Sequence, residues 1–464
     1  MLERLQPERV FYHFEKICRI PHGSGNPTAI GDYCAAFAAE RGIRCIRDAY
    51  GNVVLYKACD IERAPVILQG HLDMVCVADA DTQIDFLKDP LPVDTDGEYV
   101  FCRGTSLGAD DGIAVAMILA LLEDDTLYAP PIEAVFTMDE ETGMFGAAGF
   151  DPKLLRGRRM LNLDSEAEGV FWVSCAGGER VTITLPMQTE ACGMQALRVR
   201  LAGLQGGHSG TEIDKGRLNA VHTLARLLSE CGGRLALLNG GTVDNAIPSF
   251  AEAVWAGEAD MLRDAYSRLS KTWRETEPGI LLETETLSAK DVCFTAQDSA
   301  RLLSLLAAIP CGVQSMSRDI EGLVETSLNL GVCVTDADGV HLHHSVRSSV
   351  DAARAALIAE MERIAAEYGA SVRRDSPYPA WQYRADSPLR EAASKAYADL
   401  YGAKPDIQAI HAGLECGLFS GKIPELDCIS MGPDIFDIHS PKERLSVAST
   451  ARTYALVRKI LETI

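Results

Sequence analysis

Hydrophobic and polar positions along the first part of the chain predict strands that alternate with helices. The short apolar runs typical of buried strands lie at 53–56, 65–68, 132–138 and 160–163. Helical spacing predicts a helix at 28–41, and the nearly all-apolar run 111–122 predicts a second, buried helix. Strands that alternate with helices favour an α/β fold built around one sheet.

The pattern changes after residues 177–178. Alternating, half-exposed strands are predicted at 181–185 and 197–201, and helices at 217–229, 260–274 and 350–368. Prolines at 377, 379 and 388 mark a second boundary. After it, a predicted strand at 428–431 and a predicted helix at 444–460 return to the α/β pattern of the first part of the chain. We expect a first domain in two parts, 1–185 and 381–464, with a second domain at 186–380 inserted between them.

Metal-type ligands follow several of these apolar segments. They are His71 and Asp73 in HLD, Asp110 in GADDG, Glu140 and Glu141 in TMDEETG, Asp164 in LNLDSE, and His439 in DIHSP. The carboxyl ends of strands in an α/β sheet share one edge, so these places suggest one site. A carboxylate-rich set with two histidines and no cysteine suits two divalent ions better than a structural Cys-type zinc site. Because His439 would complete a site begun at His71, the segment between the two parts is an insertion.

Each ligand also has a purely structural explanation. Asp73 can accept a proton from a metal-binding His71, but H-x-D also occurs in ordinary loops. Asp110 can cap the helix 111–122 or bridge two cations, and Asp111 is expected to serve the helix N-terminus. Asp164 fits either a metal site or a solvated turn.

The adjacent Glu140 and Glu141 are harder to explain without a cation. Two neighbouring acids after an apolar run would repel each other if both were buried, and a metal ion relieves that repulsion. One glutamate can bind the metal while the other takes a proton from water and passes it to a leaving amine. A solvated turn is the alternative.

Composition narrows the class of protein. The 464 residues suffice for two cores, and 44 Lys and Arg against 66 Asp and Glu give a formal charge of −22, which argues against nucleic-acid or anionic-membrane partners. The 14 cysteines include no C-x-x-C pair, which favours a reducing compartment. Without an apolar leader or a membrane-length apolar run, we expect a soluble cytoplasmic protein.

The motifs GHLD, GADDG, DEE, LDSE, GGHSG, NAIP and HSP, in this order, resemble the di-zinc metallopeptidases that include carboxypeptidase G, aminoacylase and carnosinase. HAGLECG at 411–417 and CAGG at 175–178 resemble the aminoacyl-histidine dipeptidase, or peptidase D, branch. The resemblance covers nearly the whole chain. It implies a catalytic domain with a mixed sheet flanked by helices, an inserted α+β lid domain, and cytosolic hydrolysis of small peptides such as Xaa-His dipeptides.

The resemblance also implies a role for each residue of the first domain. His71 and Asp164 would hold one metal ion, Glu141 and His439 the other, and Asp110 would bridge both. Asp73 would orient His71, and Glu140 would be the general base for attack by a metal-bridging hydroxide. The ions would be Zn²⁺, with Co²⁺ or Mn²⁺ as alternatives.

Four further residues would contact the substrate. His208 of GGHSG would polarise the scissile carbonyl, Asn245 of NAIP and Glu415 of HAGLECG would contact the peptide, and Arg347 of RSS would bind its terminal carboxylate. A turn histidine, a turn residue before a proline and a surface cation are the structural alternatives for His208, Asn245 and Arg347. His411 is interpreted as a buried structural histidine.

Two other functions compete with a dipeptidase. An amidase or deacylase of N-acyl amino acids would use the same metals, whereas a non-catalytic binding protein should have lost ligands or the glutamate base, and none is missing. His341, His343 and His344 form a further cluster, with the first two on one face of a predicted strand. We favour a surface strand over another metal site there. The sequence does not determine the preferred dipeptide or whether the chain forms a homodimer.

Overall fold

The computed structural model describes residues 2–289 and 292–464, which belong to two compact units. The first unit comprises Met1–Ser174, Tyr383–Ala409 and Leu414–Ile464, and the second comprises Cys175–Gln382 and Ile410–Gly413. The expected boundary after residue 185 falls at the end of β9 (Gly177–Leu185), which belongs to the second unit because it pairs with strands there. The brief return of the chain to the second unit at Ile410–Gly413 was not predicted.

A mixed sheet forms the centre of the first unit. Its order is β1 (Arg44–Arg47), β2 (Val53–Lys57), β6 (Ile132–Thr137), β3 (Val66–His71), β7 (Arg159–Asn162), β23 (Asp427–Ser430), β8 (Val170–Cys175) and β22 (Asp406–Ile410). The strands β6, β3, β7 and β23 run parallel to their neighbours in this group. All residues of β3 and β6 are buried, as is usual for parallel strands covered on both faces. The predicted α/β sheet is therefore present.

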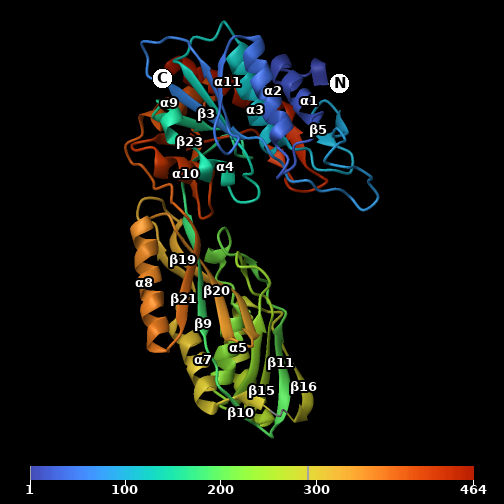
Figure 1. Cartoon of the computed structure of the whole chain (residues 1–464), viewed down its shortest axis with the longest axis vertical. Coiled ribbons are helices and arrows are strands. Elements are labelled where there is room, and N and C mark those ends of the chain that lie inside the picture. The colour runs from blue at the N-terminus through green and yellow to red at the C-terminus, as the bar shows by residue number, and fades with distance from the viewer. Residues whose placement is uncertain (1, 290–291) are drawn as a thin grey trace. The chain divides into compact units, whose positions relative to one another are not determined.

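Helices cover this sheet. They are α1 (Glu8–Cys18), α2 (Thr28–Glu40), α3 (Ala109–Glu123), α4 (Phe145–Gly149), α9 (Pro388–Tyr401), α10 (Glu415–Lys422) and α11 (Val447–Thr463). Figure 1 shows α1, α2 and α3 close together, with α3 packed against α1 and β3. The α3 residues from Ala109 to Leu122 are buried, which explains why this helix has no polar face.

The predicted helix at 444–460 begins later than expected. Residues Arg444–Ser446 form β25, which joins β24 (Ile435–Phe436), β5 (Tyr99–Cys102) and β4 (Val93–Thr95) in a small antiparallel sheet. Ser446 then caps α11, because its Oγ accepts a hydrogen bond from the N–H of Ser449. The pairing of β25 with β5, distant in sequence, decides this boundary.

The second unit is an antiparallel sheet with helices packed on it. The order is β16 (Leu281–Ala289), β11 (Gln195–Ala202), β15 (Ala251–Ala256), β13 (Arg234–Gly240), β19 (Val324–Asp336), β20 (Gly339–Ser348), β9 and β21 (Ser371–Tyr378), and β18 (Gly312–Met316) pairs with β19. Two short ladders pair β10 (Thr189–Ala191) with β17 (Val292–Phe294) and β12 (Gly207–His208) with β14 (Ala246–Ile247). The helices are α5 (Ala220–Ser229), α6 (Ala259–Thr276), α7 (Ala296–Ala308) and α8 (Asp351–Glu367).

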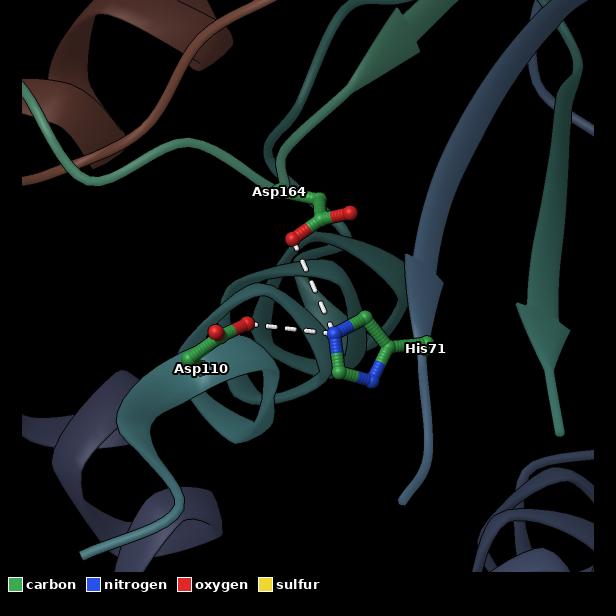
Figure 2. A group of neighbouring side chains, drawn as sticks. All are labelled: His71, Asp110 and Asp164. Carbon is green, nitrogen blue, oxygen red and sulfur yellow. Dashed lines mark hydrogen bonds and ion pairs between the residues drawn. The ribbon is translucent and has the colours of Figure 1, made fainter. Parts of the chain in front are cut away.

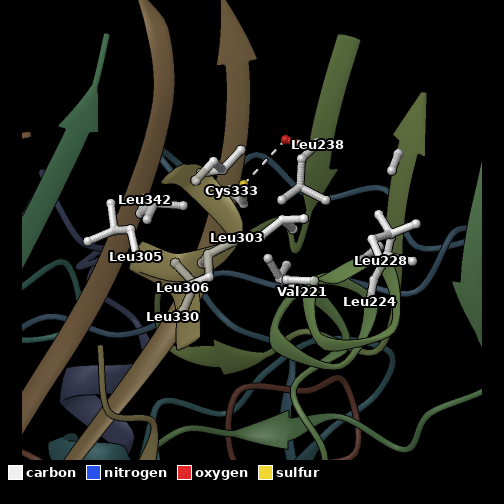
Figure 3. Close-up of a cluster of buried hydrophobic side chains, with 14 of the residues drawn as sticks. Val221, Leu224, Leu228, Leu238, Leu303, Leu305, Leu306, Leu330, Cys333 and Leu342 are labelled. Atoms are coloured by element: carbon white, nitrogen blue, oxygen red, sulfur yellow. Dashed lines mark hydrogen bonds between the residues drawn. The ribbon is translucent and has the colours of Figure 1, made fainter. Parts of the chain in front are cut away.

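The core of the second unit lies between its helices and its sheet. Figure 3 shows Leu224 and Leu228 of α5 facing Leu303 and Leu306 of α7 above the strands. The Cys333 thiol donates to the carbonyl of Leu238 at 3.3 Å, so this buried cysteine acts as a small core residue. Within the described residues, the helices include none that is long and apolar enough to cross a membrane.

The predicted shared face of His341 and His343 is confirmed. In the β20–β9 register they lie opposite Thr184 and Thr182, and their Nδ1 atoms are 3.0 and 3.1 Å from the two hydroxyl oxygens. His344 points to the other face and is buried. Among the described residues, the clusters that could hold a metal ion do not include these histidines.

Candidate metal centre

The ends of the parallel strands bring the predicted ligands to one edge of the first unit's sheet. His71 is the last residue of β3 and lies beside Thr137, the last residue of β6, from which Glu140 and Glu141 follow. Asn162 ends β7, two residues before Asp164. This common edge is where α/β sheets usually place their sites.

His71 lies between two carboxylates. Its Nε2 is 3.1 Å from Oδ1 of Asp110 and 3.7 Å from Oδ1 of Asp164, as Figure 2 shows. The His71 side chain is buried, and the two acids are nearly so. One ring nitrogen and two carboxylate oxygens thus converge from β3, α3 and the end of β7.

His439 completes a second group around the same aspartate. Its Nε2 is 3.1 Å from Oδ2 of Asp110 and 2.9 Å from Oε1 of Glu141. The two oxygens of Asp110 therefore contact different histidines, one each. His71, Asp110 and Asp164 form one compact cluster of donor atoms, and Asp110, Glu141 and His439 form another.

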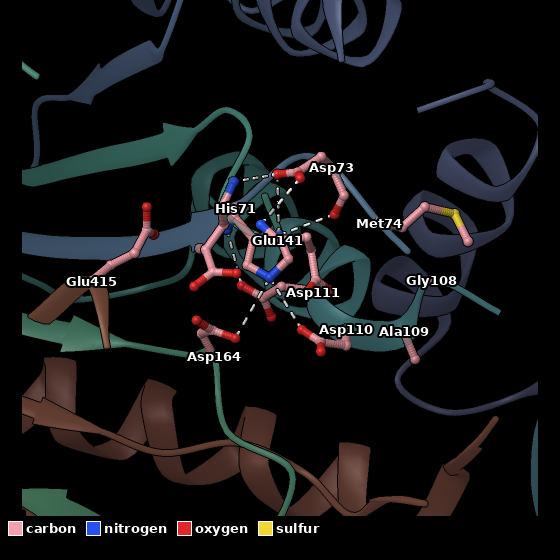
Figure 4. Close-up of polar contacts among 12 residues, drawn as sticks. His71, Asp73, Met74, Gly108, Ala109, Asp110, Asp111, Glu141, Asp164 and Glu415 are labelled. Carbon is pink, nitrogen blue, oxygen red and sulfur yellow. Dashed lines mark hydrogen bonds and ion pairs between the residues drawn. The ribbon is translucent and has the colours of Figure 1, made fainter. Parts of the chain in front are cut away.

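Asp73 organises the neighbouring segments (Figure 4). His71 Nδ1 is 3.0 Å from the main-chain oxygen of Asp73 and 3.6 Å from its carboxylate, so the backbone oxygen makes the closer contact. The Asp73 carboxylate accepts hydrogen bonds from the N–H of Glu140 at 2.9 Å and of Glu141 at 3.3 Å, and from the Ser24 hydroxyl at 2.8 Å. One residue thus holds both His71 and the Glu140–Glu141 segment.

Burial and like charges strongly perturb the acids of this cluster. Burial, together with Glu415, Glu141 and Asp110, raises the pKa of Glu140 to about 8. Burial and neighbouring aspartates likewise raise the pKa of Asp164. In the absence of a cation, burial and the neighbouring negative charges therefore favour the protonated forms of both carboxyl groups.

The pKa values of the two histidines are raised as well, but by neighbouring negative charges. Hydrogen bonds to Asp110 and Glu141 raise the pKa of His439 to about 10. Burial by itself would lower the pKa of His71, yet Asp164, Asp110 and Asp73 raise it above the ordinary value. Protons on the histidines and acids therefore balance the negative charge that a bound cation would otherwise balance.

The donor set fits two divalent cations. It consists of imidazole nitrogens and carboxylate oxygens, the ligands of zinc and related ions, and Asp110 presents one oxygen to each cluster. Buried carboxylates that face one another without a counter-charge are costly, and cations remove that cost.

Asp111 has a different role from the one predicted. We expected it to serve the N-terminus of α3, but its backbone is not helical and its Oδ2 accepts a hydrogen bond from the N–H of His71 at 3.1 Å. Asp111 therefore joins the start of α3 to the end of β3. Burial raises its pKa well above the ordinary value.

Sequence reasoning missed Glu443. Its carboxylate accepts hydrogen bonds from four consecutive backbone N–H groups, those of Leu107, Gly108, Ala109 and Asp110, at 2.7 to 3.3 Å. This contact fixes the loop that presents Asp110. The one available signal was a glutamate four residues after His439, which by itself does not distinguish a buried side chain from an exposed one.

A buried polar layer lies directly beneath the cluster. Oε2 of Glu415 accepts hydrogen bonds from Nε2 of Gln69 at 2.6 Å and from the Thr137 hydroxyl at 2.7 Å, and Nδ2 of Asn162 donates to Gln69 at 2.5 Å. The Glu415 side chain is fully buried, which argues against the predicted substrate contact. Burial raises its pKa to about 7.

In the second unit, His208 is held in one tautomer. Its Nδ1 accepts hydrogen bonds from the N–H groups of Gly210 at 3.2 Å and Thr211 at 3.1 Å, so the ring proton is on Nε2. Burial and the charge of Arg347 lower its pKa. His208 is thus a neutral hydrogen-bond donor.

The other predicted substrate residues of this unit differ in exposure. Asn245 is exposed, whereas Arg347 is nearly buried and donates from Nη1 to the Tyr378 hydroxyl at 3.1 Å. Nε of Arg347 is buried without a hydrogen-bond partner among the described residues. His411 is buried beside Ser327 at 2.8 Å, and burial with the Arg347 charge lowers its pKa to about 3, as suits a structural histidine.

The raised pKa of Glu415 predicts a pH-dependent stability of the metal-free protein. The folded state keeps this proton up to about pH 7, whereas the unfolded state loses it near 4.5, so the free energy of unfolding falls as pH rises through this interval. Glu415→Gln keeps an oxygen acceptor but cannot ionise. It should equal the wild type at the lower end of this interval and exceed it by up to about 3 kcal/mol at the upper end, at about 1.4 kcal/mol per pKa unit.

Urea unfolding of the metal-free full chain across this pH range measures the effect. The exposed Glu40→Gln is the matched control and should leave the pH dependence unchanged. An identical pH slope for Glu415→Gln and the wild type would contradict the assignment.

Comparisons with known proteins identify the family of this chain. Residues 67–463 match the model of Peptidase family M20/M25/M40. The whole chain is 39% identical to the Cytosol non-specific dipeptidase of Escherichia coli (strain K12), of which 99% is covered. A crystal structure of aminoacylhistidine dipeptidase from Vibrio alginolyticus matches with a TM-score of 0.94 and 36% identity, over 100% of this chain and 98% of that one.

More distant structures share the fold. The aminopeptidase PepT from Bacillus cereus matches with a TM-score of 0.59 at 16% identity, over 99% of both chains. The family match and the two dipeptidase relatives confirm the resemblance seen in the motifs and the class of enzyme, a hydrolase of peptide bonds. The chain therefore belongs to peptidase family M20/M25/M40.

Proposed function

We propose that this chain hydrolyses dipeptides at a centre that holds two divalent ions. The observation that carries the proposal is Asp110, whose two oxygens each lie 3.1 Å from Nε2 of a different histidine, His71 or His439. The names of the Escherichia coli and Vibrio relatives support a dipeptide substrate, and the first of them supports a cytosolic location.

The two clusters suggest how the ions are shared. His71 and Asp164 would hold one ion and Glu141 and His439 the other, and Asp110, which belongs to both groups of donor atoms, would be shared. When bound, the ions polarise the peptide carbonyl and make water a better nucleophile at neutral pH. We propose Zn²⁺ because the donors are nitrogen and oxygen, and Co²⁺ or Mn²⁺ accept the same set.

Glu140 is the proposed general base. Its main-chain N–H is held by Asp73, while its carboxylate lies within the group formed with His71 and Glu141. Its pKa of about 8 without metal falls when cations balance the neighbouring acids, so the carboxylate is free to accept a proton. Glu140 takes that proton from the attacking water and passes it to the leaving amine.

Two residues of the second unit are proposed to recognise the peptide. His208 donates from Nε2 to the carbonyl oxygen, and this hydrogen bond strengthens as negative charge develops there. Arg347 offers a guanidinium whose Nε has no hydrogen-bond partner among the described residues, and a guanidinium is a good partner for a terminal carboxylate. Asn245 is exposed and is proposed as a further contact.

Metal removal and a substrate panel test the function. Exhaustive chelation should abolish hydrolysis of unblocked dipeptides, and added Zn²⁺ should restore it, since water needs activation. Steady-state rates on dipeptides and on matched N-acyl amino acids measure the class of substrate. Full turnover by a protein that is metal-free by elemental analysis would refute the mechanism, and faster turnover of the N-acyl compounds would indicate an amidase instead.

The two adjacent glutamates should respond differently to the same substitution. Glu140→Gln should keep two ions while turnover falls by about a hundredfold or more, because an amide accepts no proton. Glu141→Gln, its matched control, should lose metal because it removes a charged ligand. Elemental analysis and kcat are measured on both variants, and the reverse result would exchange the two roles.

Changes in the second unit should separate binding from catalysis. Arg347→Met keeps the length of the side chain and should raise KM while erasing the preference for a free carboxylate over an amide. His208→Ala should mainly lower kcat, since its hydrogen bond is strongest in the transition state. Steady-state kinetics on dipeptide and dipeptide-amide pairs measure KM and kcat for each variant. The exposed Arg373→Met is the control. Unchanged discrimination in Arg347→Met would remove that residue from the site.

A further inference from the structure

Arg347 lies in a row of residues that crosses three neighbouring strands of the second unit. Figure 1 shows β20, β9 and β21 side by side. In their antiparallel registers Arg347 of β20 is opposite Gly178 of β9, and Gly178 is opposite Tyr378 of β21. Residues directly opposite each other in a sheet share a face. Gly178 therefore separates the side chains of Arg347 and Tyr378 on one face of the sheet.

A bulge in β21 puts Tyr378 into this row. Between the pairs made by Arg180 and by Gly178, β21 has one residue more than β9. Ser376, within this bulge, has a φ of 50°, in the left-handed region. In an unbroken ladder Pro377 would be opposite Gly178, and the Tyr378 side chain would point to the other face of the sheet.

The absence of a side chain at Gly178 lets the tyrosine reach across β9. A Cβ atom on Gly178 would lie 2.4 Å from Cζ and from the hydroxyl oxygen of Tyr378, closer than a carbon atom can approach either. The tyrosine ring therefore lies against the main chain of Gly178, and its hydroxyl oxygen accepts a hydrogen bond from Nη1 of Arg347 at 3.1 Å. This contact gives a physical reason for the second glycine of the CAGG motif at 175–178.

The main chain of Tyr378 is fixed separately from its ring. Nη1 of Arg354 donates to the Tyr378 carbonyl at 2.7 Å, and Nη2 of the same arginine pairs with Asp351 of α8 at 2.9 Å. Pro379 follows directly and favours extended backbone angles at Tyr378. Burial raises the pKa of the Tyr378 hydroxyl above its ordinary value, which keeps it neutral. Tyr378 therefore presents a fixed, uncharged oxygen to Arg347.

This contact leaves another edge of the guanidinium available for a ligand. The Arg347 side chain is nearly buried, and its Nε has no hydrogen-bond partner among the described residues. In a guanidinium, Nε shares an edge with Nη2, and that edge can donate to both oxygens of one carboxylate. Because Nη1 is bonded to Tyr378, the Nε edge of Arg347 cannot turn away without loss of that hydrogen bond.

We infer that Tyr378 is a positioning residue for recognition of the peptide's terminal carboxylate, and that Gly178 provides the space across which it acts. The inference rests on the proposed function, in which Arg347 binds that carboxylate. Tyr378 holds Nη1 of Arg347, and Arg347 presents its Nε edge to the substrate. Since Tyr378 acts through Arg347 and not on the reacting atoms, its loss should change KM and leave kcat nearly unchanged.

The test compares Tyr378→Phe with the wild type in the metal-loaded full chain, with alanyl-alanine and alanyl-alaninamide as substrates. Phenylalanine keeps the ring and removes only the hydroxyl. It should raise KM for the dipeptide about five- to tenfold, because a hydrogen bond to a charged group is lost. The KM for the amide and both kcat values should change by less than about twofold, because only the carboxylate contact depends on Arg347.

Tyr266→Phe is the matched control. The Tyr266 hydroxyl donates to the carbonyl of Ile280 at 3.1 Å elsewhere in the same unit, so this variant loses a tyrosine hydrogen bond of the same length without touching Arg347. It should leave the KM values for the dipeptide and for the amide unchanged.

Double variants test the route of the effect. After Arg347→Met, Tyr378→Phe should not lower the preference for a free carboxylate any further, because the guanidinium that it positions is absent. Gly178→Ala should lower this preference in the wild type and have no further effect on it after Tyr378→Phe. Thermal unfolding reports whether each variant is folded, and Tyr378→Phe with Arg347→Met is sufficient if Gly178→Ala is not.

The outcomes separate this inference from the proposed function. If Arg347→Met erases the preference and Tyr378→Phe leaves it intact, the positioning role is wrong and the carboxylate contact of Arg347 stands. An equal effect of Tyr378→Phe with and without the guanidinium would also overturn the inference. If Arg347→Met leaves the preference unchanged, the contact and the inference fail together. Calorimetric binding of both peptides to metal-loaded Glu140→Gln variants measures the same preference independently of turnover.

Discussion

Several carboxylates lie close together at one buried edge of the first unit's sheet. Their mutual repulsion constrains the charge and the position of the groups around them. Asp110, Glu141 and Asp164 can lie so close only if positive charge lies between them. Without metal, the raised pKa values of His71 and His439 favour positive charge on these rings, and those of Glu140 and Asp164 favour the loss of negative charge. Bound cations would balance the same negative charge that protons balance in the metal-free protein. The site is therefore electrostatically suited to cations.

Side chains outside the two clusters position the charged residues within them. Glu443 fixes the loop before Asp110 through four backbone N–H groups. Gln69 lies two residues before His71 on β3, so strand alternation puts both on one face, and Asn162 at the end of β7 donates to Gln69. Together with Glu415, these side chains form a buried hydrogen-bonded layer next to the ligands.

The two units contribute different chemistry. The first supplies acids and histidines with strongly shifted pKa values, which suit metal binding and proton transfer. The second contains His208, whose proton is fixed on Nε2, and Arg347, whose charge adds to burial in lowering the pKa values of His208 and His411. Burial and this guanidinium together favour the neutral form of both imidazoles.

The sequence by itself determined the elements that depend on local pattern. Apolar runs followed at once by ligands predicted the strands β3, β6 and β7 and the convergence of His71, Asp110, Glu141 and Asp164, because parallel strands bring their carboxyl ends together. Motif order also indicated the family. The roles of His208, Asn245 and Arg347 stay predictions, since each rests on the motifs and on local geometry alone.

Only the tertiary structure decided which atoms meet. Glu443 reaches Leu107 across 336 positions, Glu415 reaches Gln69 across 346, and the chain returns to the second unit at Ile410–Gly413. It also decided that Asp111 bonds the backbone of His71 and that 444–446 is a strand. A glutamate has the same local pattern whether it is exposed or accepts buried N–H groups, so its role depends on partners that a local pattern does not contain.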